Sequence, residues 1–131
     1  MKKFFSKFKI KFFLINFFLI FSYLFPGSLP GLALNNNLRA QPQITPDFIV
    51  SSNHFYVFIL VSFIGFLTFN KLKQVKNLII YLILLSIILE ILHLIIPLRS
   101  FQWSDLFGNL LGVIVVIFSN ILINKYEEFK K

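Results

Sequence analysis

The chain contains four long apolar runs almost free of charged residues, and these runs limit what it can fold into. A membrane-spanning helix needs about 20 predominantly apolar residues. None of the runs alternates between polar and apolar residues as a membrane β-strand does. With 57% hydrophobic and only 14% charged residues, the composition differs from that of an ordinary soluble domain. We therefore predict a single all-α membrane domain, residues 1–131, forming a bundle of four transmembrane helices at about 10–25, 47–69, 77–97 and 105–123.

Basic residues mark the ends of these runs and predict an orientation. They form clusters before the first run, between the second and third, and after the fourth. The clusters are Lys2, Lys3, Lys7, Lys9 and Lys11; Lys71, Lys73 and Lys76; and Lys125, Lys130 and Lys131. Because short cytoplasmic loops are enriched in Lys and Arg, both termini are expected in the cytoplasm of a multi-pass cell-membrane protein. Segments of about 26–47 and 98–104 then face outward, the first as irregular surface structure.

The composition also excludes several functions. The chain has no Cys, which rules out a disulfide scaffold, a thiolate nucleophile and a Cys-ligated metal site. Lys patches separated by long uncharged runs are typical of a membrane protein, so no nucleic-acid partner is expected. Membrane lipid is the expected partner. A different reading of the first run remains open, in which it is a signal peptide cleaved after Ala33.

Polar residues of the predicted spans gather in one layer near the outer surface. Ionisable residues inside a membrane are costly and point to function. The layer contains the candidate ligand-binding residues His54, Glu90, His93, Arg99, Asp105 and Asn109. Helical spacing places Ser86, Glu90, His93 and Pro97 on one face of the third span, and Asp105 and Asn109 on one face of the fourth. His54, Phe58, Ser62 and Gly65 share a stripe on the second. The layer predicts a polar pocket that opens outward.

Glu90 is the best catalytic candidate, although no catalytic residue is assigned. A buried carboxyl can serve as a general acid or base, but Glu90 could instead pair with His54, His93 or Arg99 and hold the helices together. His54 is equally compatible with packing and with a ligand site.

The remaining polar residues also have two readings. Arg99 suits phosphate or carboxylate binding, or else a salt bridge to Asp105 or a contact with lipid phosphate. Asp105 could simply cap the fourth span. Asn109 and Gly112 favour helix contacts over chemistry. Gly108 with Gly112 forms a GxxxG pair that predicts close helix packing, and a homo-oligomer through these two glycines is left open. Trp103 and the Tyr residues near span ends are expected to be interface anchors.

These motifs resemble the VanZ-like family, named for a protein associated with teicoplanin resistance. The family pattern is D-K-x-x-H-F, then E-x-x-Q, a Pro-Gly-Arg turn, and D-x-x-x-N-x-x-G. The matching residues are His54-Phe55, Glu90, Pro97, Arg99, Asp105, Asn109 and Gly112. The chain departs from it with Val50-Ser51 for D-K, His93 for Gln, and Leu98 for Gly. The resemblance covers about residues 12–120 and implies a four-span bacterial envelope protein.

The same residues are also the candidate ligands for a metal ion. Di-metal bundles use two E-x-x-H motifs with two further Glu, whereas this chain has a single one, Glu90 with His93. A mononuclear site from His54, Glu90, His93 and Asp105 is geometrically possible. Because the resembled pattern has Gln at the position of His93, we predict no metal and no cofactor.

The expected function is binding, in the outward pocket, of a lipid headgroup, a cell-wall precursor or a glycopeptide-type amphiphile. Two alternatives remain open. The chain could be an intramembrane enzyme that acts on a lipid-linked phosphate with Glu90 as acid or base, or an assembly partner that binds no ligand.

Overall fold

The chain is entirely helical in the part that the structure describes. The computed structural model describes residues 2–130, with side chains from Phe8 onward, and contains no strand within that range. The side chains of Lys2, Lys3 and Lys7, and all of Lys131, lie outside it, although they form part of the predicted charge pattern. The helices are α1 (Lys2–Leu24), α2 (Leu29–Asn35), α3 (Ser52–Thr68), α4 (Leu72–Leu92) and α5 (Trp103–Phe129).

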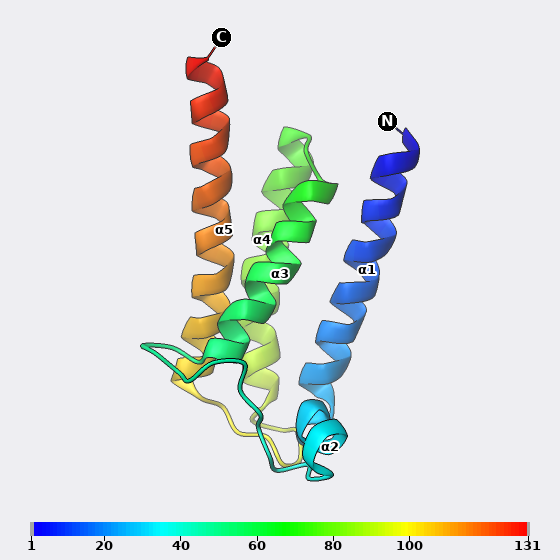
Figure 1. Cartoon of the computed structure of the whole chain (residues 1–131), viewed down its shortest axis with the longest axis vertical. Coiled ribbons are helices and arrows are strands. Elements are labelled where there is room, and N and C mark those ends of the chain that lie inside the picture. Colours follow the sequence, from blue (N-terminus) through cyan, green and yellow to red (C-terminus); the bar gives the residue numbers. More distant parts are fainter. Residues whose placement is uncertain (1, 131) are drawn as a thin grey trace.

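The four long helices lie side by side, with all their connections at two ends (Figure 1). The termini and the short turn between α3 and α4 lie at one end, and α2 and the two longer loops lie at the other. Helices α4 and α5 are long and apolar enough to cross a membrane. The part of α1 from Phe8 and α2 form a third candidate if this pair, bent by 84°, is one span, whereas α3 is a shorter apolar helix.

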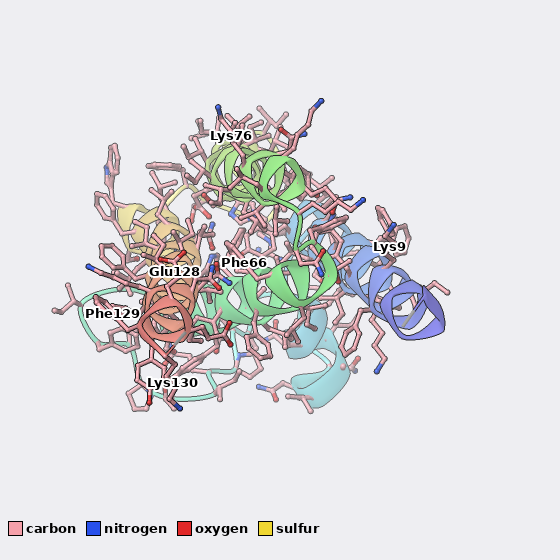
Figure 2. All side chains as sticks on the ribbon, turned by 90° about the horizontal axis from the view of Figure 1, so that it is seen from above. Lys9, Phe66, Lys76, Glu128, Phe129 and Lys130 are labelled. Atoms are coloured by element: carbon pink, nitrogen blue, oxygen red, sulfur yellow. The ribbon has the colours of Figure 1, made fainter. Side chains whose placement is uncertain are left out.

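The bundle exposes large apolar side chains on its outside and buries polar side chains among the apolar ones of its core. Phe17 and Phe18 of α1 are each 62% exposed, whereas Ser62 and Ser86 are fully buried. Seen from the end that carries the termini, Lys9, Lys76 and Lys130 lie at the periphery of three different helices (Figure 2). A large apolar exterior is unfavourable in water, and this distribution supports a membrane protein.

Helices α3 and α5 pack with their backbones almost touching. A Cβ atom added at Gly108 would lie 2.8 Å from the carbonyl oxygen of Ser51, and one at Gly112 would lie 2.6 Å from that of Phe55. The close helix approach predicted from the GxxxG pair is confirmed, with α3 of the same chain as the partner. Both glycines are buried, so a second copy could not use this surface without displacing α3.

The second predicted span begins five residues too early. Helix α3 starts at Ser52 rather than at Asp47, because the Asp47 side chain stays outside the helix and its Oδ1 accepts a hydrogen bond from the Ser52 N–H at 2.9 Å. The preceding segment is also more ordered than predicted. Helix α2 forms within it, because the Ser28 Oγ accepts a hydrogen bond from the Gly31 N–H at 3.0 Å and caps the helix.

The third predicted span, 77–97, lies too far toward the C-terminus compared with the helix that forms. Helix α4 begins at Leu72, since Lys and Gln are good helix formers and their polarity does not end a helix, and it ends at Leu92. Beyond it, the N–H groups of His93 and Leu94 bind carbonyls three residues earlier, a tightening that precedes Pro97. Pro97 therefore does not share the helical face of Glu90. Helices α1 and α5 extend past the predicted bounds, to Lys2 and Phe129.

Candidate functional site

Four helix ends bring the polar layer together at the end of the bundle that carries α2. Tyr23 lies in the last turn of α1, His54 in the first turn of α3 and Asp105 in the first turn of α5. Glu90 lies in the last turn of α4, and His93 follows it directly. Residues far apart in the sequence thus face one another because antiparallel helices begin and end at the same level.

Asn109 is the centre of a hydrogen-bond network that joins four helices. Its Nδ2 donates to the Ser86 carbonyl of α4 at 3.2 Å. Its Oδ1 accepts from the Tyr23 hydroxyl at 2.7 Å and lies 3.0 Å from the His54 Nδ1. The Tyr23 hydroxyl also lies 2.9 Å from that Nδ1. Because Asn109 is fully buried, this network holds the His54 ring in one orientation.

Glu90 is fully buried beside both histidines. Its Oε1 accepts a hydrogen bond from the Gln102 N–H at 3.0 Å. Its Oε2 lies 3.3 Å from the His93 Nδ1 and 3.9 Å from the His54 Nδ1, yet makes no hydrogen bond. Of the three partners considered for Glu90, the two histidines lie within ion-pair distance, and His93 is the nearer.

His93 and Arg99 both bind the C-terminal end of α1. The His93 Nε2 donates to the Tyr23 carbonyl at 3.1 Å. The Arg99 guanidinium donates to the carbonyls of Ser22 at 2.8 Å and Phe25 at 3.4 Å. The last carbonyls of a helix have no hydrogen-bond partner within the helix. His93 and Arg99 donate the hydrogen bonds that these carbonyls lack. Arg99 therefore binds backbone carbonyls, whereas the sequence had left open a salt bridge to Asp105. Partial burial lowers the pKa of Arg99 from its ordinary value.

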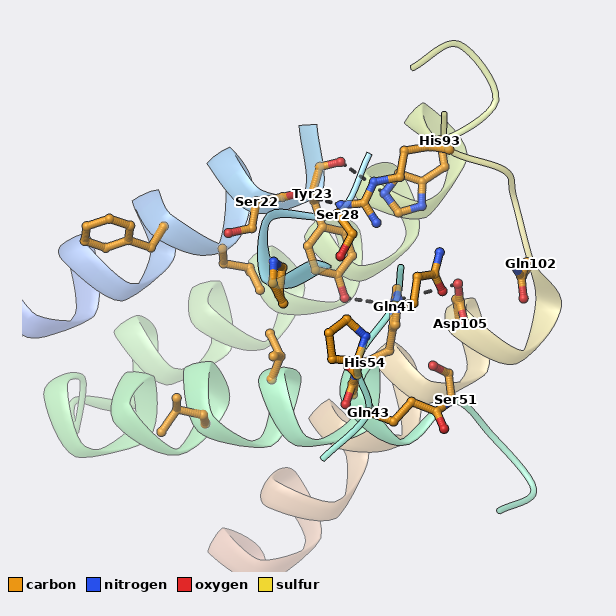
Figure 3. Close-up of a pocket in the computed structure, with 18 of the residues that line it drawn as sticks. Ser22, Tyr23, Ser28, Gln41, Gln43, Ser51, His54, His93, Gln102 and Asp105 are labelled. Atoms are coloured by element: carbon orange, nitrogen blue, oxygen red, sulfur yellow. Dashed lines mark hydrogen bonds and ion pairs between the residues drawn. The ribbon is translucent and has the colours of Figure 1, made fainter. Parts of the chain in front are cut away.

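A cavity of about 430 Å³ opens between α1, α3 and the outer loops. One part of its wall is apolar and is made by Ile15, Phe18, Leu19, Val57 and Leu60. The other part is polar and includes Ser22, Tyr23, His54, His93, Arg99, Gln102 and Asp105. Figure 3 shows Tyr23, His54 and Asp105 around the same space. The cavity is therefore apolar at one end and polar at the other.

The structure divides the six predicted ligand-binding residues into two groups. His54, His93, Arg99 and Asp105 line the cavity. Glu90 and Asn109 are fully buried behind this wall and are not part of it. Glu90, the best catalytic candidate, therefore reaches the cavity only through the neighbouring imidazoles.

Tyr23 is the residue that sequence reasoning missed. As a Tyr near a span end it was expected to be an interface anchor, but it is only 8% exposed and its hydroxyl binds Asn109. The only signal in the sequence is its level in the first span, which is that of the polar layer.

A comparison of the chain with models of known protein families, with curated proteins and with solved structures finds no match. The VanZ-like resemblance therefore remains a prediction from the short motifs.

Proposed function

We propose that this chain is a multi-pass membrane protein that binds an amphiphilic molecule in the cavity between α1 and α3. The divided wall of the cavity carries the proposal. Apolar side chains suit a hydrocarbon tail, whereas the polar end offers donors, acceptors and charges of both signs to a headgroup. Most small-molecule sites are concave, largely apolar and have only a few convergent polar groups.

The position of the apolar wall supports entry from the membrane. Phe18 of α1 and Leu60 of α3 both line the cavity, and they are 62% and 51% exposed on the outside of the bundle. The cavity therefore reaches the apolar exterior between these two helices. A lipid tail could enter by this opening without its headgroup leaving the polar layer.

The proposal includes four spans, α1, α3, α4 and α5, with both termini in the cytoplasm. The 17 residues of α3 extend for about 26 Å, close to the thickness of a bilayer core of about 30 Å. The end of the bundle that carries the termini and the turn between α3 and α4 (Figure 1) includes Lys9, Lys71 and Lys125. Because basic residues prefer the cytoplasmic side of a membrane, this end is the one that would face the cytoplasm. The cavity then faces outward.

VanZ-like membership, and with it a role in the bacterial envelope, is part of the proposal. One backbone feature supports it. Leu98 stands where the family pattern has Gly, and its φ is +61°, in the left-handed region that favours glycine. The ligand classes under this proposal are a lipid headgroup, a cell-wall precursor and a glycopeptide-type amphiphile.

The two alternatives have less support. An enzyme that uses Glu90 as acid or base would need to move its proton through His54 or His93, because Glu90 does not line the cavity. An assembly partner that uses the GxxxG face would need a surface that α3 already covers.

A tryptophan at the mouth of the cavity tests the proposal. Leu60→Trp adds bulk to the cavity wall, whereas Leu67→Trp is the same change on the same helix at a residue that is 43% exposed and outside the wall. Both variants and the wild type are purified in detergent and titrated with labelled phosphatidylglycerol, a polyprenyl phosphate and teicoplanin. We expect at least one probe to bind the wild type, and Leu60→Trp to weaken it about tenfold, equivalent to about 1.4 kcal/mol, with Leu67→Trp unchanged.

Two results would contradict this proposal. One is that none of the three probes binds the wild type. The other is that Leu60→Trp and Leu67→Trp bind every probe as the wild type does, which would place the ligand elsewhere.

A further inference from the structure

The hydrogen bonds of Asn109 determine which nitrogen of His54 carries a proton. The Asn109 Nδ2 donates to the Ser86 carbonyl, so Oδ1 is the atom that faces His54, at 3.0 Å from Nδ1. An amide oxygen can only accept a hydrogen bond. The His54 Nδ1 is therefore the protonated nitrogen, and in a neutral ring Nε2 keeps its lone pair.

The free nitrogen of His54 faces a carboxylate. The His54 Nε2 lies 3.5 Å from the Asp105 Oδ2. An imidazole lone pair and a carboxylate oxygen repel each other unless a positive species lies between them. That species is either a proton, carried by His54 as an imidazolium or by Asp105 as a neutral carboxyl, or a metal ion.

A third side chain favours the metal ion. One ligand atom each from His54, Glu90 and Asp105 lies within 4.8 Å of the other two. The Glu90 side chain is fully buried, and its Oε2 makes no hydrogen bond. A proton between His54 and Asp105 would leave the Glu90 Oε2 with only the His93 Nδ1, 3.3 Å away, whereas a divalent ion would bind both carboxylates.

We propose that His54, Glu90 and Asp105 bind a divalent transition-metal ion. One imidazole and two carboxylates suit Zn²⁺ or Mn²⁺. Metal-ligating histidines commonly donate their other ring N–H to an oxygen that fixes the ring, and the Asn109 Oδ1 occupies that position. Three helices, α3, α4 and α5, each supply one ligand.

This inference differs from the prediction of no metal, and the difference comes from His93. The prediction was based on the Gln that the resembled family pattern has at the position of His93. In the structure the His93 Nε2 is bound to the Tyr23 carbonyl, and the proposed ion needs no ligand from His93. Because His54 and Asp105 also line the cavity, the ion would be accessible from it.

Metal content tests this proposal without any knowledge of the amphiphile. The full-length protein is purified in detergent, treated with a chelator, incubated with Zn²⁺, desalted and analysed by elemental mass spectrometry. We expect one Zn²⁺ per chain, with the affinity reduced at least about tenfold in Asp105→Asn and in Glu90→Gln. Asp47→Asn is the matched control, since Asp47 lines the same cavity outside the cluster.

A spectroscopic measurement covers the case in which a variant fails to fold. Co²⁺ added to the wild-type protein is expected to give visible absorption bands, and Zn²⁺ to displace them. A wild-type protein that takes up no Zn²⁺ or Co²⁺ overturns the metal site. So does a loss of affinity in Asp47→Asn equal to that in Asp105→Asn. Amphiphile binding that persists in chelator, in a protein without metal uptake, would retain the proposed function and reject this inference alone.

Discussion

Gly112→Leu is expected to separate α5 from α3 and to destabilise the bundle. Even a Cβ atom at Gly112 would lie 2.6 Å from the Phe55 carbonyl oxygen and 2.9 Å from the Phe58 Cβ, closer than such atoms approach. Backbone atoms of α3 cannot move aside as a flexible side chain can. Overpacking of this kind costs about 1–3 kcal/mol, and leucine should reach the upper part of that range. The measurement is denaturant-induced unfolding of the purified protein in mild detergent, followed by circular dichroism.

Val115→Leu is the control for this change. Val115 lies on α5 and is 40% exposed, so one added methylene there meets no backbone, and wild-type stability is expected. Gly112→Ala should fall between the two. A Gly112→Leu protein as stable as the wild type would show that α3 and α5 do not pack as described.

Glu90→Leu is expected to have the second large effect, and Glu90→Gln to have a small one. Leucine leaves the Gln102 N–H without its acceptor, and leaves His93 beside an apolar side chain in a buried position. A buried N–H that loses its acceptor costs about 1–3 kcal/mol, and the loss of a polar partner for His93 adds to this cost. Glutamine keeps an oxygen for the Gln102 N–H, and its loss of stability should stay below about 1.5 kcal/mol.

The same unfolding measurement distinguishes these two variants. Equal stability of Glu90→Leu and the wild type would contradict the hydrogen bond and the ion pair described for Glu90. A large loss in Glu90→Gln alone would indicate that the charge itself, rather than the acceptor oxygen, stabilises the bundle.

The helices could be predicted from the apolar runs, but their bounds could not. A run of apolar residues shows which residues avoid water, and this property does not stop where a helix does. Lys73 and Lys76 are polar and still helical, because their long side chains favour helix formation. Asp47 lies before α3 because its carboxylate binds the helix from outside.

The polar layer could also be predicted, whereas the order of residues within it could not. Their positions at the outer ends of two predicted spans put His54 and Asp105 at the same level, and the structure places the His54 Nε2 3.5 Å from the Asp105 Oδ2. The rotation of each helix about its own axis depends on packing between helices. The contact of Gly112 with α3 turns Asn109 inward, away from the cavity wall. For the same reason, the sequence did not show that Tyr23 faces the bundle.

Photo-crosslinking tests most directly whether the cavity between α1 and α3 holds an amphiphile. The probe is a phospholipid with a photoreactive group in its acyl chain, and the labelled residues are mapped by mass spectrometry after digestion. We predict labelling that is reduced by Leu60→Trp and concentrated on the apolar wall, at Ile15, Phe18, Leu19, Val57 and Leu60. Labelling spread evenly over outward residues such as Phe63 and Phe118, which are 54% and 63% exposed, would contradict the account.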